Sequence, residues 1–146
     1  MNNTRAILPA VAAIIFNEKG EVLLQRRKDV NQWCIISGHV EFGESISEAM
    51  LREIQEETGL EASIVRFIGL YSSPSSQTYC YGERTVQYVT AYFEAALSGS
   101  LNPHLFNDET IELRYFSPAA LPDDLAQLNP YWLEDALNKN EAPFIR

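Results

Sequence analysis

The sequence predicts a mixed α/β fold in which helices cover a mixed β-sheet. Three observations support this class: short runs rich in β-branched and aromatic residues, one well-delimited amphipathic helix near residues 46–58, and a capping residue followed by proline at 129–130. The chain has 146 residues, 46% of them hydrophobic, which is enough to bury a core. We therefore expect residues 1–146 to form a single domain.

The first half of the chain predicts three strands and then a helix. Strands are expected over residues 9–16 and 21–27, and the polar turn at 17–20 between them indicates a hairpin. A short strand is expected at 33–36, and the helix at 46–58.

The second half predicts further strands at 62–71, 85–96 and 111–116. A polar segment with turn residues, 72–77, lies between the first two and is expected to be a loop. Ser117 and Asn129 each precede a proline, as a capping residue does at the start of a helix. The second of these pairs is expected to open a C-terminal helix that runs through Leu137.

Charge and cysteine content exclude several classes of protein. The net charge is −9, whereas duplex DNA and anionic membranes require a basic surface. Cys34 and Cys80 form no CxxC pair, so we expect neither a disulfide framework nor a structural zinc site, and we expect both side chains to be buried. The longest apolar run, Ile7–Phe16, is too short to span a bilayer, and no cleavage site follows it. A cytoplasmic protein is expected.

The helix at 46–58 has clear signals at both ends. Ser45 and Glu48 form a capping box, and Gly59 supplies the left-handed residue that ends many helices. Helical spacing places three apolar side chains along one stripe of this helix: Ile46, Met50 and Ile54. Three glutamates fall together on an adjoining arc: Glu53, Glu56 and Glu57.

Two interpretations of this arc are possible: a solvated acidic face, or a site for a hard divalent cation such as Mg²⁺. The loop before the helix favours the cation, because residues 38–60 contain six glutamates and a single arginine and hold more than half of the net charge. Gly38 and Gly43 have the spacing of a phosphate-binding loop, but Glu44 stands where that loop needs lysine. This loop is therefore expected to bind phosphate only through a metal ion.

The same residues resemble a complete Nudix box, Gly38-x5-Glu44-x7-Arg52-Glu53-Ile54-x-Glu56-Glu57-x-Gly59-Leu60. The flanking segments, Leu24 to Arg27 and Arg114 to Pro118, are also similar to this family. One departure is Ile36-Ser37-Gly38, where many members have Pro-Gly-Gly. The resemblance implies a Nudix-type α/β/α sandwich. It also implies hydrolysis of a nucleoside diphosphate linked to another group, by water attack at phosphorus, with Mg²⁺ or Mn²⁺.

By the same resemblance, the metal ligands would be Glu53, Glu56 and Glu57, together with a backbone carbonyl near Ser37 or Gly38. A helix glutamate such as Glu53 would act as the base, or else Glu109, a loop acid outside the box whose alternative is an ordinary exposed residue. Glu44 would orient the metal cluster or its waters, and Arg52 would hold the box carboxylates in place.

Candidates for substrate binding lie outside the box. Arg26 and Arg27 could reach the distal phosphate, although a basic strand end at the surface is equally compatible with them. Tyr79, Tyr81 and Trp33 could stack on a base, with core or rim packing as the alternative.

A small-molecule nucleotide is the expected partner, with neither duplex nucleic acid nor a membrane involved, and a homodimer is left open. Two other functions compete with this one: a non-catalytic nucleotide sensor, and an RNA 5′-end pyrophosphohydrolase. The intact set of carboxylates disfavours the sensor, and the net charge of −9 disfavours the RNA enzyme, which needs a basic approach path.

Overall fold

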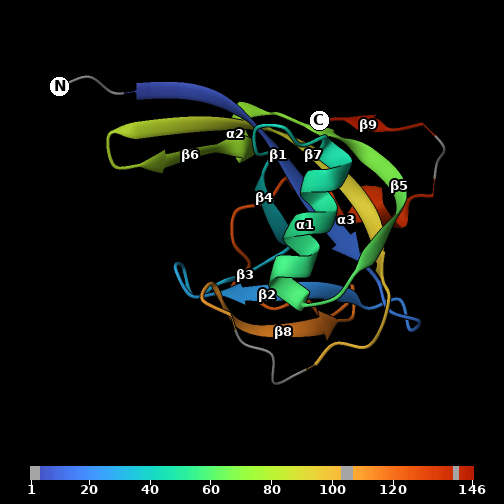
Figure 1. Ribbon diagram of the computed structural model, residues 1–146. Coiled ribbons are helices and arrows are strands. Elements are labelled where there is room, and N and C mark those ends of the chain that lie inside the picture. Colours follow the sequence, from blue (N-terminus) through green and yellow to red (C-terminus); the bar gives the residue numbers. More distant parts are fainter. Residues whose placement is uncertain (1–3, 103–106, 140–141) are drawn as a thin grey trace.

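The strands of the protein form a six-stranded sheet and a three-stranded sheet in the computed structural model, which describes residues 4–102, 107–139 and 142–146 (Figure 1). The larger sheet has the order β4-β1-β7-β5-β9, and β6 pairs with β7. It is mixed, because β1 runs parallel to β7 while β5 runs antiparallel to β7. Its strands are β1 (Thr4–Ile15), β4 (Ile36–His39), β5 (Ala62–Tyr71), β6 (Thr78–Tyr81), β7 (Arg84–Leu97) and β9 (Phe144–Ile145).

The smaller sheet is antiparallel, with the order β3-β2-β8. Its strands are β2 (Val22–Arg27), β3 (Trp33–Cys34) and β8 (Thr110–Phe116). The helices are α1 (Ile46–Thr58), α2 (Pro74–Gln77) and α3 (Trp132–Leu137). The predicted α/β class with a mixed sheet is confirmed.

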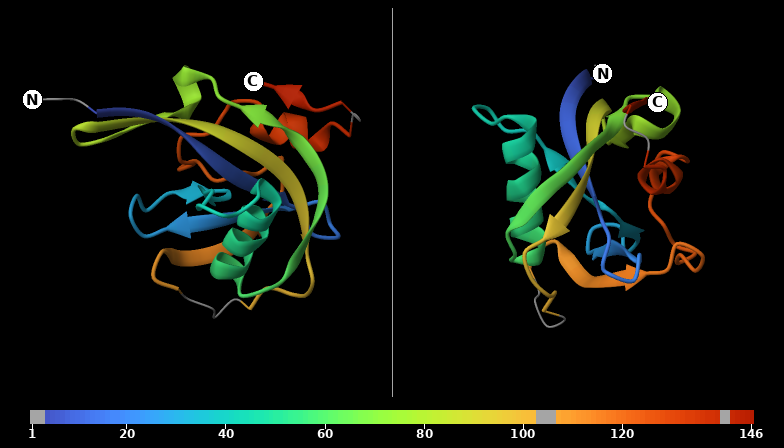
Figure 2. Two further views of the ribbon diagram at one scale, coloured as in Figure 1. Left: turned by 45° about the horizontal axis from the view of Figure 1, so that its top comes forward. Right: turned by 90° about the vertical axis from the view of Figure 1, so that its right-hand side faces the viewer.

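Apolar clusters cover both faces of the larger sheet. Side chains alternate along β1, so Val11 and Ile15 pack toward α1 while Ala12 and Ile14 pack toward the other face. Figure 2 shows α1 and α3 on opposite sides of this sheet. Burial on both faces explains why β1 is a nearly continuous apolar run.

The predicted hairpin of the first two strands is wrong, although its turn is present. Asn17 donates its backbone N–H to the carbonyl of Glu21 over 3.0 Å, and Phe16 forms an isolated bridge with Val22. Beyond this bridge β1 pairs with β7 along its whole length, whereas β2 pairs with β8. The predicted strand at 33–36 is likewise divided at Ile35 between β3 and β4, which belong to different sheets.

Smaller differences concern the second half of the chain. Residues 74–77 form the short helix α2 instead of a loop, and β6 and β9 were not predicted. Residues 117–120 form a turn instead of the start of a helix. The C-terminal helix α3 begins at Trp132, because the side chain of Asn129 accepts the N–H of Tyr131 in a turn that precedes the helix. Cys34 is buried as expected, but Cys80 is exposed, since β6 extends beyond the packed core (Figure 1). No described helix is long and apolar enough to cross a membrane.

Candidate active site

The predicted capping box of α1 is confirmed. The Ser45 hydroxyl accepts the N–H of Glu48 over 3.1 Å, and the Glu48 carboxylate accepts the N–H of Ser45 over 3.4 Å. Gly59 has a φ of 72° and donates its N–H to the carbonyl of Gln55. Met50 and Ile54 are fully buried, whereas Ile46 is 44% exposed. This apolar face turns the glutamates at 53 and 57 toward the interior.

Glu53 lies directly against the backbone of β4. Its carboxylate occupies the space that a Cβ atom on Gly38 would need, so residue 38 has to be glycine for the side chain to lie there. The Glu53 side chain is 13% exposed. Burial raises the pKa of Glu53 to about 7, although Arg52 beside it opposes the rise.

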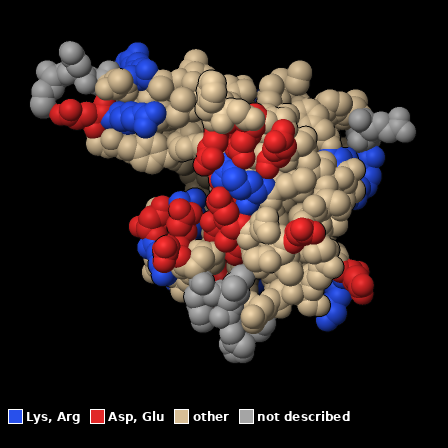
Figure 3. Space-filling view, viewed as in Figure 1, with Lys and Arg blue, Asp and Glu red and all other residues tan. Residues whose placement is uncertain are grey.

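Arg52 connects the loop before α1 to the acidic arc of the helix. Its guanidinium donates to both oxygens of Glu44, over 2.7 and 3.0 Å, and to Glu53 over 2.9 Å. It also donates to Glu56 over 3.1 Å and to the carbonyl of His39 over 3.1 Å. The hydrogen bonds that Arg52 donates to Glu44 raise the pKa of Arg52 and lower the pKa of Glu44. Figure 3 shows acidic side chains gathered around a basic centre over α1.

Glu57, which is 5% exposed, is held by side chains of the smaller sheet. Its Oε2 atom accepts a short hydrogen bond from Gln25 Nε2 and one of 2.5 Å from the Thr110 hydroxyl. Gln25 is 3% exposed and Thr110 is fully buried. Burial raises the pKa of Glu57, and the hydrogen bond from Thr110 opposes that rise.

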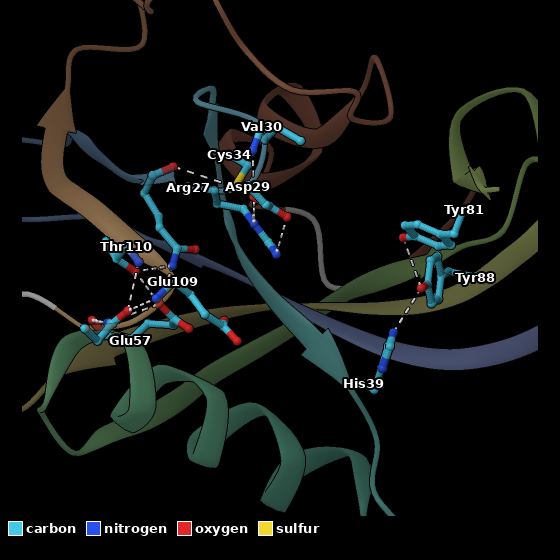
Figure 4. Close-up of polar contacts among 12 residues, drawn as sticks. Arg27, Asp29, Val30, Cys34, His39, Glu57, Tyr81, Tyr88, Glu109 and Thr110 are labelled. Carbon is cyan, nitrogen blue, oxygen red and sulfur yellow. Dashed lines mark hydrogen bonds and ion pairs between the residues drawn. The ribbon is translucent and has the colours of Figure 1, made fainter.

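Glu109 lies beside Glu57, at the start of β8 (Figure 4). The carboxyl group of Glu109 contributes to the raised pKa of Glu57 through both a hydrogen bond and its charge. Asn107 shapes this segment, because its side-chain oxygen accepts the backbone N–H groups of Glu109 and Thr110, each over 2.9 Å. The sequence analysis missed Gln25, Asn107 and Thr110, and the polar turn before β8 was the one available signal for the last two.

A cavity of about 650 Å³ adjoins these carboxylates and receives side chains from several predicted site residues. Glu53, Glu56, Arg52 and Glu109 line it, together with the predicted substrate-side residues Arg27, Tyr79 and Tyr81. The guanidinium of Arg27 is bonded to Asp29 over 3.1 Å. The cavity lining also includes His39, Arg84 and Tyr88, which the sequence analysis did not select.

Two of the predicted substrate-side residues are not among the residues that line the cavity. Arg26 donates to Asn31 over 2.9 Å, and its guanidinium lies 5.8 Å from the ring centre of Trp33. Trp33 is 3% exposed and packs edge-on against Phe116. The geometry therefore favours surface pairing for Arg26 and core packing for Trp33.

The oxygen atoms of this site are of the kind that a hard divalent cation binds, but the carboxylates of α1 do not point toward one common position. Within the described ranges, no group of three or more His, Cys, Asp or Glu side chains is arranged to hold a metal ion. Arg52 binds Glu53 and Glu56, while the smaller sheet holds Glu57. The chemistry nevertheless suits Mg²⁺ or Mn²⁺, because carboxylate oxygens from one helix adjoin the glycine backbone at position 38.

The fold and this site define an α/β protein whose capped acidic helix borders an open cavity. Residues 6–136 match the family model described as NUDIX domain. The chain therefore belongs to the Nudix family.

Named relatives differ in the substrates that their names give. A Bacillus subtilis (strain 168) protein, provisionally named an 8-oxo-dGTP diphosphatase, is 36% identical over 109 residues, which are 75% of this chain and 66% of that protein. An ADP-ribose pyrophosphatase of Methanocaldococcus jannaschii is 41% identical over 70 residues, 45% of this chain and 41% of its own length. The chain thus spans less than two thirds of each of these relatives.

Among solved structures, one titled UDP-X diphosphatase has a TM-score of 0.75 and 26% identity, and the match covers 89% of this chain and 61% of that one. An ADP-ribose pyrophosphatase from Streptococcus suis 89-1591 has a TM-score of 0.71 and 22% identity, and the match covers 95% of this chain and 97% of that one. The second likeness shows the fold alone.

Proposed function

We propose that this protein hydrolyses the pyrophosphate linkage of a nucleoside diphosphate joined to another group, with Mg²⁺ or Mn²⁺ as the cofactor. The observation that supports it most is the meeting of Glu53 and Glu56 of α1 with Glu109 of the β8 segment at one cavity. We also propose that residues 1–146 act as a single domain. The cytoplasmic location and the homodimer stay predictions.

Glu53, Glu56 and Glu57, with the carbonyl of Gly38, would hold the cation. When bound, the cation would neutralise phosphate charge and lower the pKa of an attacking water molecule. Nudix hydrolases generally use divalent metal ions. The mostly buried side chain of Glu53, 13% exposed, supports its role as a ligand, because a bound cation offsets the cost of burying its charge.

The other residues would position groups or move protons. Glu109 is exposed and lies beside Glu57, so its carboxylate can accept a proton from water at the acidic end of the cavity. Arg52 and Glu44 would hold the loop and helix in register through their paired hydrogen bonds. Arg27, on the cavity lining, would contact the distal phosphate after release from Asp29.

A substrate panel tests this proposal. It contains nucleoside triphosphates, ADP-ribose, sugar nucleotides, dinucleoside polyphosphates and 5′-triphosphorylated RNA, each with Mg²⁺. We expect turnover of at least one small nucleotide, with ¹⁸O from labelled water in a phosphate product. Turnover restricted to the RNA would identify the RNA 5′-end enzyme instead, and no turnover at all would favour the nucleotide sensor.

A matched variant pair links turnover to the proposed site. Glu57→Gln removes a buried carboxylate charge, whereas Glu61→Gln makes the same change on an exposed residue just beyond α1. We expect the first variant to lose turnover by at least 10²-fold and the second to retain it. Equal activity in both variants would contradict the assigned site.

A further inference from the structure

The turn between β2 and β3 brings a carboxylate, that of Asp29, to the cavity. Asp29 lines the cavity together with Arg27 and Val30. Figure 4 shows the Asp29 carboxylate directed at the Arg27 guanidinium. The other described carboxylates on the lining belong to α1, to the loop before it or to the segment that leads into β8: Glu41, Glu53, Glu56 and Glu109. Asp29 is therefore an acidic group on the cavity that the proposed metal site does not use.

Arg27 and Asp29 form a paired contact that fixes the orientation of both groups. The Arg27 guanidinium donates from Nε to Oδ1 and from Nη2 to Oδ2, each over 3.1 Å. Two parallel hydrogen bonds of this kind add geometric specificity to the attraction between the charges. Asp29 Oδ1 also accepts the backbone N–H of Val30 over 2.9 Å, so the carboxylate is tied to its own turn.

Backbone hydrogen bonds hold the turn that carries this pair. Asn31 donates its N–H to the carbonyl of Arg27 over 2.9 Å, and Arg27 donates its own to the carbonyl of Gln32 over 3.0 Å. Lys28 donates its N–H to the carbonyl of Glu109 over 2.9 Å, which ties the turn to the segment before β8. Because the turn is fixed on both sides, we expect Asp29 to stay within reach of Arg27 when a ligand enters the cavity.

Asp29 offsets the positive charge that Arg27 brings to the cavity. A phosphate binds a guanidinium through the same kind of paired hydrogen bonds that a carboxylate uses. A phosphate that reaches Arg27 must therefore either replace Asp29 at the Nε and Nη2 atoms or bind beside its negative charge. Arg52, another arginine on the lining, is itself bonded to glutamates and cannot compensate for this loss of attraction.

We propose that Asp29 is a specificity-determining residue that competes with phosphate for Arg27 and thereby lowers the affinity of the cavity for a phosphate group at that position. This inference rests on the proposed function and deepens it, because it assigns a competitor within the chain to one of the proposed phosphate contacts. A ligand that places a neutral group beside Arg27 avoids the cost of displacing Asp29. Asp29 thus favours such ligands over those that place a phosphate there.

Binding of α,β-methylene-ADP, an analogue whose phosphate linkage resists hydrolysis, tests the inference separately from turnover. Dissociation constants are measured with Mg²⁺ by isothermal titration calorimetry for the wild type and for Asp29→Asn, which removes the charge and keeps the shape of the side chain. The side chains of Arg27 and Asp29 are 32% and 58% exposed. We therefore expect the variant to bind the analogue about fivefold more tightly, the upper end for an exposed charge pair. Adenosine, which has no phosphate, should bind both proteins alike.

The background of Arg27→Gln separates competition for Arg27 from direct repulsion of phosphate. Once the contested cation is gone, adding Asp29→Asn should change the affinity for the analogue by at most about twofold. Asp124→Asn is the matched control, because Asp124 pairs with Arg26 over 3.9 Å and is not among the residues that line the cavity. This control should bind the analogue as the wild type does, and equal thermal midpoints would show that the variants are folded.

Several outcomes would overturn the inference. Unchanged or weaker binding of the analogue by folded Asp29→Asn would show that Asp29 positions Arg27 for phosphate instead of competing with it. An equal gain for adenosine, or a fivefold gain that persists without Arg27, would also contradict competition. Turnover on the substrate panel without the gain in Asp29→Asn would refute this inference alone, whereas the gain without any turnover would refute the proposed hydrolysis alone.

Discussion

The carboxylate of Glu53 fills the space that a Cβ atom on Gly38 would occupy. These residues lie on different elements, Gly38 in β4 and Glu53 in α1. The contact therefore sets how closely the helix and the strand approach at the candidate metal site. It gives a physical reason for glycine at position 38, even though the preceding Pro-Gly of many Nudix members is replaced here by Ile36-Ser37.

Gly38→Ala should displace the Glu53 carboxylate while leaving the fold intact, because the group that has to move is the end of a flexible side chain. We expect Mn²⁺ affinity to fall by about 10- to 100-fold, with turnover falling in parallel. Gly99→Ala is the matched control, since the nearest atom to its new methyl group would be 3.8 Å away. Isothermal titration of Mn²⁺ checks both, and unchanged affinity in Gly38→Ala would contradict the role of this contact.

Thr110→Val removes one hydrogen-bond donor from Glu57 and keeps the shape of the side chain. The Thr110 hydroxyl donates to Glu57 over 2.5 Å, so its loss should misplace a proposed ligand and reduce kcat/KM by about 10- to 100-fold. Thr110→Ser restores the hydroxyl and should recover most of this loss. If Val and Ser variants behave alike, the hydrogen bond does not position Glu57.

The metal-free protein should become less stable as the pH rises from 5 to 8. The pKa of Glu53 is about 7 in the folded state, above its ordinary value of 4.5, because burial disfavours the charged form. The folded state therefore binds the proton more tightly than the unfolded state, and this contribution to stability is lost as the pH rises through 7. After allowance for solvent screening, we expect a loss of about 2 kcal/mol.

Urea unfolding in EDTA at several pH values measures this effect. The side chain of residue 53 in Glu53→Gln remains uncharged from pH 5 to 8. The difference in unfolding free energy between this variant and the wild type should therefore change by about 2 kcal/mol over that pH range. Parallel curves for the two proteins would show that Glu53 titrates normally in the folded state.

Arg146→Met should destabilise the protein, because it removes the charge partner of a buried carboxylate. Arg146 donates to both oxygens of Asp135, over 2.9 and 2.7 Å, and Asp135 is 1% exposed. Burial would raise the pKa of Asp135, but hydrogen bonds from Arg146 and Tyr71 outweigh it and the pKa is lowered. Chemical denaturation checks the loss, and the double variant with Asp135→Asn should recover part of it. Equal unfolding midpoints for Arg146→Met and the wild type would contradict this account.

The local features of the site were predictable from the sequence because they depend on residues near one another in the chain. The capping box of Ser45 and Glu48 spans one helical turn, and helical spacing alone places Glu53 and Glu57 on neighbouring positions. The α/β class followed similarly from the runs of strand-forming residues. Such patterns do not specify which strand pairs with which, so the turn at 17–20 was mistaken for a hairpin.

The rest of the site depends on contacts between distant residues. Gln25 and Thr110 reach Glu57 across 32 and 53 residues of sequence, through strand pairings that no local pattern reveals. Arg26 and Arg27 differ for a related reason: successive strand residues face opposite sides, and the register of β2 against β8 shifts between them. Tyr88 was missed because it approaches the cavity only through the pairing of β7 with β6 and β1.

The most direct test of the central claim is a Mn²⁺ titration of the wild type and of the double variant Glu53→Gln, Glu57→Gln, followed by electron paramagnetic resonance. We expect saturable binding to the wild type, competition by Mg²⁺, and a loss of at least 100-fold in affinity in the folded double variant. Equal Mn²⁺ binding by both proteins, or none by the wild type, would contradict the claim that the carboxylates of Glu53 and Glu57 form a metal site.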